Sequence, residues 1–118
     1  MWPVKGRVVG QFGIDINGVA NDGLNIETSS AEVVKAAEDG QIVFADYLKG
    51  WGQTIIVEHP NNYYTVYANL KNITTRMGER VQKGAPLAQV ALNNSNDIIL
   101  HFEIRKNNVS INPLRYLQ

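Results

Sequence analysis

The chain has 118 residues, of which 44% are hydrophobic and 19% charged, a balance typical of one globular domain. Eleven basic and eleven acidic residues give a formal net charge of zero, and without a basic run we expect no nucleic-acid partner. No apolar stretch reaches the roughly 18–20 residues of a membrane span. The absence of cysteine excludes disulfides and thiolate metal sites. We predict a single domain over residues 1–118, and we expect any targeting segment to lie outside this sequence.

Ten glycines separate short runs of β-branched and aromatic residues, a pattern typical of an all-β domain. In chain order, we predict strands at residues 2–12, 24–26, 31–37, 41–47, 53–59, 63–70, 85–92 and 97–105. Residues 31–37 would also suit a helical turn, but Val33-Val34 and the turn that follows favour a strand.

The connecting segments are short and rich in turn residues. Asn17-Gly18 and Asp22-Gly23 are predicted turns, and Gly50-Trp51-Gly52 closes the strand at 41–47. A short terminal helix is predicted to begin at Pro113, with Leu114 and Leu117 packed on the core. No long amphipathic helix is predicted.

The strand at 97–105 alternates between two different faces. One face is wholly apolar and is predicted to lie in the core: Ile98, Leu100, Phe102 and Ile104. The other is polar with one exception: Asp97, Ile99, His101, Glu103 and Arg105. Periodicity alone indicates a solvated sheet face, whereas a histidine and an arginine together would suit the floor of a binding groove.

Several segments, in this order and spacing, resemble the LytM (lysostaphin-type) metallopeptidase domain over nearly the whole chain. They are Trp2-Pro3, Gly6-Arg7-Val8-Val9, residues 34–43, Gly50-Trp51-Gly52, residues 55–59, Thr65-Val66-Tyr67-Ala68, Gly78, residues 81–84, residues 100–105 and residues 112–117. Each segment alone is weakly specific, and the set together is specific. The resemblance implies a compact β-sheet domain, a barrel-sandwich hybrid of the LytM type, with a long surface groove and little helix.

Active members of that family carry a His-x-x-x-Asp pair, a lone histidine after Tyr-Ala, and a His-x-His strand. A catalytic zinc needs about three protein ligands and an open position for water. By the resemblance, these five positions fall on Asn21, Asn25, Asn69, Ile99 and His101. Only His101 is retained, so we predict that the domain binds no zinc and is not an enzyme. A replacement site drawn from Asp22, His59, His101 and Glu103 is the disfavoured alternative.

The same correspondence predicts that the former catalytic face is now a partner-binding groove. Its predicted lining is Asp22, Asn25, Trp51, Tyr67, Asn69, Ile99, His101 and Arg105. Aromatic side chains and an arginine around an apolar floor are typical anchors of protein interfaces. Trp51 lies in a loop between two glycines, and its sequence context predicts a groove residue and a core or rim aromatic equally well.

Inactive LytM domains of the EnvC-like and NlpD-like subfamilies resemble this chain, and its sequence does not separate the two. The resemblance implies a non-catalytic activator of a peptidoglycan (N-acetylmuramoyl-L-alanine) amidase in daughter-cell separation, working outside the cytoplasm. The implied partners are the amidase and, second, peptidoglycan. The alternatives are a zinc endopeptidase of the cell wall and a wall-binding or scaffold domain. Residues 78–87 are also similar to biotinyl or lipoyl carrier hairpins, but no modifiable lysine at a hairpin tip is evident.

Overall fold

Twelve β-strands make up most of the part of the chain that the computed structural model describes, which is residues 1–16 and 18–117. Asn17, one of the predicted turn residues, lies outside that part. The strands are β1 (Arg7–Gly10), β2 (Asp15–Ile16), β3 (Val19–Ala20), β4 (Leu24–Glu27), β5 (Val33–Lys35), β6 (Gly40–Leu48), β7 (Gly52–His59), β8 (Tyr63–Lys71), β9 (Arg80–Val81), β10 (Pro86–Val90), β11 (Ile99–Lys106) and β12 (Val109–Ile111). Two short 3-10 helices, at Pro60–Asn62 and Pro113–Arg115, complete the elements. The all-β prediction is therefore confirmed.

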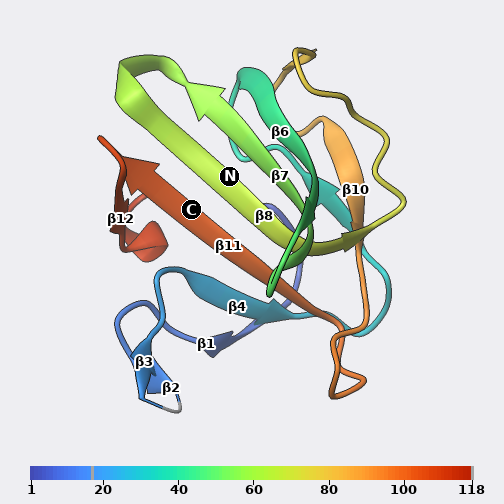
Figure 1. Ribbon diagram of the computed structural model, residues 1–118, viewed down its shortest axis with the longest axis vertical. Coiled ribbons are helices and arrows are strands. Elements are labelled where there is room, and N and C mark those ends of the chain that lie inside the picture. The colour runs from blue at the N-terminus through green and yellow to red at the C-terminus, as the bar shows by residue number, and fades with distance from the viewer. Residues whose placement is uncertain (17, 118) are drawn as a thin grey trace.

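Ten of these strands form one antiparallel sheet, whose main path runs β1-β4-β11-β8-β7-β6-β9. β12 pairs with the end of β11, and β10 pairs with the end of β8 on one side and with β5 on the other. Figure 1 shows β11, β8 and β7 as long neighbouring strands, with β4 and β1 beyond β11. The β2–β3 hairpin stands apart from this sheet as a separate pair.

The core lies against one face of β11, as the alternation predicts. Leu100, Phe102 and Ile104 are buried, and Ile98 packs partly buried against the same cluster. Phe102 lies against Tyr67 of β8, with ring centroids 5.3 Å apart. Burying large apolar side chains of this kind contributes about 1.5–3 kcal/mol each, so β11 is a main source of the fold's stability.

The chain end forms the short helix that Pro113 predicts. The side chain of Asn112 accepts a hydrogen bond from the Leu114 backbone N–H, which caps the turn, and Pro113 is buried. Leu117 packs against the core, as predicted. Leu114 was also predicted to pack on the core, and this prediction is wrong, because its side chain is exposed. A helix of one short turn presents only part of its surface to the core. No helix in the described residues is long and apolar enough to span a membrane.

Tyr67 is fully buried, and its hydroxyl belongs to a polar network inside the sheet. It accepts from the Ala37 backbone N–H at 3.0 Å and lies 2.8 Å from the Thr65 hydroxyl, which is 2.8 Å from Nε2 of His59. Burial raises the pKa of Tyr67 to about 12, against smaller lowering effects of the hydrogen bonds from Ala37 and Thr65. The phenol therefore stays neutral in the folded state well above pH 10.

This raised pKa predicts alkaline instability. The unfolded chain releases the Tyr67 proton near pH 10, whereas the folded state keeps it to about pH 12. Stability from this group is complete below pH 10 and is lost as pH rises towards 12, by about 2 kcal/mol. Urea unfolding at pH 9 and pH 12 measures the loss. Tyr67→Phe is the control, and its loss over this interval should be smaller by that amount; equal losses would contradict the assignment.

Candidate functional site

A groove of about 710 Å³ crosses the sheet face opposite the core. Its floor is formed by side chains of β4, β8 and β11, and its walls by the β2–β3 hairpin, the β6–β7 loop and the loop after β10. The lining residues are Val19, Ala20, Asn21, Asp22, Asn25, Tyr47, Gly50, Trp51, Gly52, Ala68, Asn69, Leu92, Asn93, Asn94, Ile99 and His101. The structure thus brings together in one groove all five positions that the resemblance assigns to ligands and proton-handling residues.

Strand register explains this convergence. His101 of β11 lies directly opposite Asn25 of β4 on one side and Ala68 of β8 on the other. Ile99 lies two residues before His101 on the same face of β11. Neighbouring strands are about 4.8 Å apart, so side chains from three adjacent strands meet at one point on the sheet.

Tyr67 does not line the groove, and the prediction that placed it there is wrong. The prediction assumed regular alternation, in which Tyr67 and Asn69 share a face. Asn69 instead has a positive φ of 67°, and the β7–β8 register shifts between Gln53 and Thr54. This irregularity reverses the alternation, so Asn69 joins Ala68 on the groove floor while Tyr67 faces the core.

Arg105 also lies outside the groove lining. It is four residues beyond His101 on β11, which is about 13 Å along an extended strand. Its guanidinium is turned towards Glu103, with Nη1 2.9 Å from Oε1, and Nη2 reaches the Asn108 carbonyl at 3.4 Å. The prediction of Arg105 as a groove residue is therefore wrong for this conformation.

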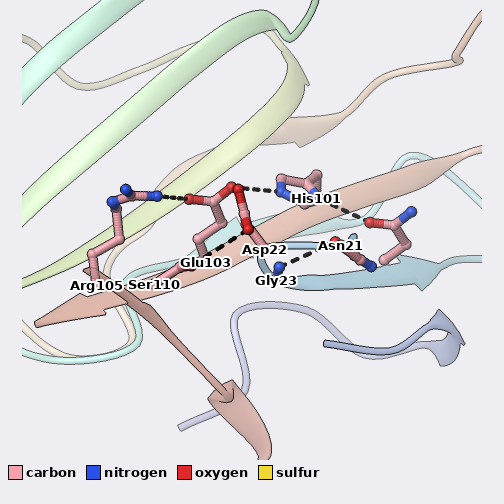
Figure 2. Close-up of polar contacts among 8 residues, drawn as sticks. Asn21, Asp22, Gly23, His101, Glu103, Arg105 and Ser110 are labelled. Atoms are coloured by element: carbon pink, nitrogen blue, oxygen red, sulfur yellow. Dashed lines mark hydrogen bonds and ion pairs between the residues drawn. The ribbon is translucent and has the colours of Figure 1, made fainter. Parts of the chain in front are cut away.

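A chain of polar contacts runs along the groove face of β11 from Arg105 to His101 and continues to Asn25 of β4. Nδ1 of His101 is 2.7 Å from Oδ1 of Asn25, and Nε2 is 2.9 Å from Oε2 of Glu103. Figure 2 shows Arg105, Glu103 and His101 in a row along the strand, beside the Asn21–Gly23 turn. Both ring nitrogens of His101 are thus occupied by protein groups.

Glu103 is the buried member of this chain, at 2% exposure. The turn before β4 covers it, because a Cβ on Gly23 would come within 2.9 Å of Cγ of Glu103. Burial alone would raise the pKa of Glu103, but hydrogen bonds and charge from His101 and Arg105 outweigh burial and hold the pKa below its usual value. The carboxylate is therefore ionised at neutral pH and accepts from both neighbours.

The residues present do not fit a zinc ion. Asn21 Oδ1 accepts from the Gly23 N–H, and Asn69 Nδ2 donates to the carbonyls of Ala91 and Ile99. Neutral amides engaged in this way are poor zinc ligands, and Ile99 offers no ligand atom. Among residues 1–16 and 18–117, no group of three His, Cys, Asp or Glu side chains could hold a metal ion. His59, considered for a replacement site, is instead buried in the core network beside Thr65.

The sequence prediction missed several residues of the groove walls. Four of them are large or exposed on the rim: Val19, Tyr47, Leu92 and Asn94. Val19 is 71% exposed, Tyr47 60% and Leu92 60%. A tyrosine just before the Gly50-Trp51-Gly52 loop was an available signal, whereas the positions of Val19 and Leu92 depend on how a hairpin and a loop fold over the sheet.

The β-sheet and the groove across its face define a β domain of the metallopeptidase type, and the described floor of that groove presents amides, Ile99 and His101. Residues 19–113 match peptidase family M23, and the chain belongs to that family. It is 36% identical over 117 residues to the murein hydrolase activator NlpD of Escherichia coli (strain K12). The matched region spans 98% of this chain and 30% of NlpD. The chain is 34% identical to the cell division protein DipM of Caulobacter vibrioides, over 88% of this chain and 17% of DipM. The solved structure of Helicobacter pylori Csd3 superposes with a TM-score of 0.86 and 27% identity, over 98% of this chain and 32% of Csd3.

Proposed function

We propose that this domain is non-catalytic and that it activates a peptidoglycan amidase by binding it through the groove. The observation that carries the proposal is the groove floor. An open trough of about 710 Å³ is retained, but it is floored by amides, an isoleucine and one histidine whose ring nitrogens are both engaged. Such a floor is suited to holding a partner, because its amide and imidazole groups are engaged with protein groups and leave no free base among them.

The groove rim supports a protein partner. Val19, Tyr47, Trp51 and Leu92 are exposed apolar side chains, and all four line the same groove. Exposed apolar patches with polar rims mark interaction sites, and tryptophan and tyrosine are frequent anchors there. We propose that an apolar segment of the amidase lies across these four residues.

The relatives support the biological setting. NlpD is named a murein hydrolase activator and DipM a cell division protein, and this chain covers 30% and 17% of them. Because murein lies outside the cytoplasm, we propose an extracytoplasmic location and a role in daughter-cell separation. The similarity to NlpD favours the NlpD-like subfamily over the EnvC-like one.

The alternatives predict different outcomes in one experiment. The domain is mixed with a cognate amidase and labelled peptidoglycan, and release of label is measured with and without the amidase. An activator releases label only with the amidase present, and an endopeptidase releases label alone. A wall-binding scaffold sediments with peptidoglycan without affecting release. The proposal would be rejected if the domain neither stimulated the amidase nor formed a detectable complex with it.

Trp51→Ala is expected to raise the concentration for half-maximal amidase stimulation by about 10- to 30-fold, because it removes a central aromatic anchor. Dose–response curves with peptidoglycan release as the readout measure the shift. Tyr116→Ala is the matched control, since Tyr116 is a similarly exposed aromatic outside the groove lining. Equal curves for the parent and the Trp51 variant would show that the partner binds elsewhere.

A further inference from the structure

The indole of Trp51 packs against the ring of His101 in the groove lining. Their ring centroids are 4.8 Å apart and their planes meet at 63°, an edge-on contact. The Trp51 backbone is tied to Leu48 and Asn69 by hydrogen bonds of 2.9 and 3.0 Å, but the side chain is 38% exposed. The His101 ring is thus a contact through which the orientation of the indole can be set.

The His101 ring is itself held by hydrogen bonds at both of its nitrogens. An imidazole held at both nitrogens cannot turn about its χ2 bond without breaking a hydrogen bond, and the two holders are Asn25 and Glu103. The Glu103 carboxylate is in turn fixed by Arg105 at its other oxygen and by the close approach of Gly23. Glu103 itself is buried and does not line the groove.

We propose that Glu103 is a positioning residue, which sets the orientation of His101 and, through it, of the Trp51 indole that a partner meets. The consequence for the amidase rests on the function proposed above, whereas the effect on Trp51 is a property of this chain alone. A preformed wall lowers the ordering cost of binding, because the aromatic anchor need not be immobilised when the partner arrives. A carboxylate buried under the Gly23 turn would thus tune affinity without touching the partner.

Two nearly isosteric replacements separate positioning from simple packing. Glu103→Met fills the same space but offers no hydrogen bond to His101. Glu103→Gln can accept from Arg105 through its oxygen and donate through its amide to Nε2 of a neutral His101 ring. A role confined to filling space predicts the same behaviour for both variants, whereas a positioning role predicts rescue by glutamine.

The first readout is the fluorescence of Trp51 in a Trp2→Phe background, which leaves Trp51 as the single tryptophan. Acrylamide quenching reports how freely the indole meets solvent. Glu103→Met is expected to raise the quenching constant about twofold and the half-maximal amidase dose about tenfold, the effect of losing one hydrogen bond to a charged group. Glu103→Gln is expected to stay close to the parent in both measurements.

Glu27→Met is the matched control. Glu27 also forms an ion pair, with Arg7 at 2.6 Å, but it lies outside the groove lining. It should leave both readouts unchanged. If Glu103→Met does not fold, Arg105→Leu replaces it, because this half-exposed side chain anchors the same carboxylate and its loss should raise Trp51 quenching.

The outcomes separate the two proposals. The positioning role would be overturned if Glu103→Met folded and its Trp51 were quenched as in the parent. If Glu103→Met did not fold, the same result for folded Arg105→Leu would overturn it. Both conclusions hold whatever the effect on the amidase. Equal increases for methionine and glutamine would also overturn the positioning role. If Glu103→Met changed the quenching of Trp51 but neither the parent nor any variant stimulated the amidase, the proposed function would be rejected. The positioning role would remain supported.

Discussion

The double variant Asn21→His/Asn25→Asp is expected to bind one zinc ion with a Kd below about 1 µM, equivalent to about 8 kcal/mol, while the parent chain shows no saturable binding in this range. Together with His101, the two substitutions would rebuild a two-histidine, one-carboxylate ligand set. Isothermal titration calorimetry with zinc measures both proteins.

The geometry at His101 supports this expectation. Nδ1 of His101 and Oδ1 of Asn25 are 2.7 Å apart, and atoms that share one tetrahedral zinc lie about 3.3 Å apart, so a small adjustment would suffice. Asn21 lines the same groove. His101→Ala in the double variant is the control, and it should abolish saturable binding. No binding by the double variant would show that position 21 or 25 is misassigned, and stoichiometric zinc in the purified parent would contradict the non-catalytic assignment.

Zinc binding alone is not expected to restore hydrolysis. The resemblance assigns the proton-handling positions to Asn69 and Ile99, and Asn69 Nδ2 instead donates to the carbonyls of Ala91 and Ile99. The double variant should therefore bind zinc and leave labelled peptidoglycan intact, which the same release assay measures. Release of label would show that another residue of the groove can handle protons.

The strands and the core face of β11 were predictable because their signals are local. Alternation of Leu100, Phe102 and Ile104 follows from strand geometry, and burial on one side fixes the register. Pro86 also lies at the start of β10, where a strand loses least from a missing N–H. The convergence of Asn25 and His101 follows from the family correspondence, and periodicity alone would not have given it.

The errors arose where backbone irregularity or tertiary contacts decide the outcome. The positive φ at Asn69 reverses the faces of β8, and its only local sign is an asparagine inside a strand, where asparagine is depleted. Glu103 was expected on an open polar face, but the turn at Gly23 covers it and Arg105 turns towards it. The alternation of side chains along one strand does not predict a contact such as that of Gly23 with Glu103, which are about 80 positions apart in the chain.

Tyr67→Ala is expected to lower the free energy of unfolding by about 3–5 kcal/mol, because it removes a fully buried aromatic ring and leaves a cavity beside Phe102. The hydroxyl network adds to the loss, since the Ala37 N–H is left without its partner. Urea unfolding monitored by circular dichroism measures the change. Tyr67→Phe, which keeps the ring, should lose only about 1–3 kcal/mol, and the exposed Tyr116→Ala less than about 1 kcal/mol.

The same variant separates a core role for Tyr67 from the groove role that alternation predicted. If Tyr67 acts only through the core, amidase stimulation by Tyr67→Ala should fall in proportion to the unfolded fraction and recover under conditions that keep the domain folded. A groove residue would lose stimulation while the domain stayed as stable as the parent. Because the ring packs against Phe102 on the face of the sheet opposite Asn69, we expect loss of stability to account for the whole loss of stimulation.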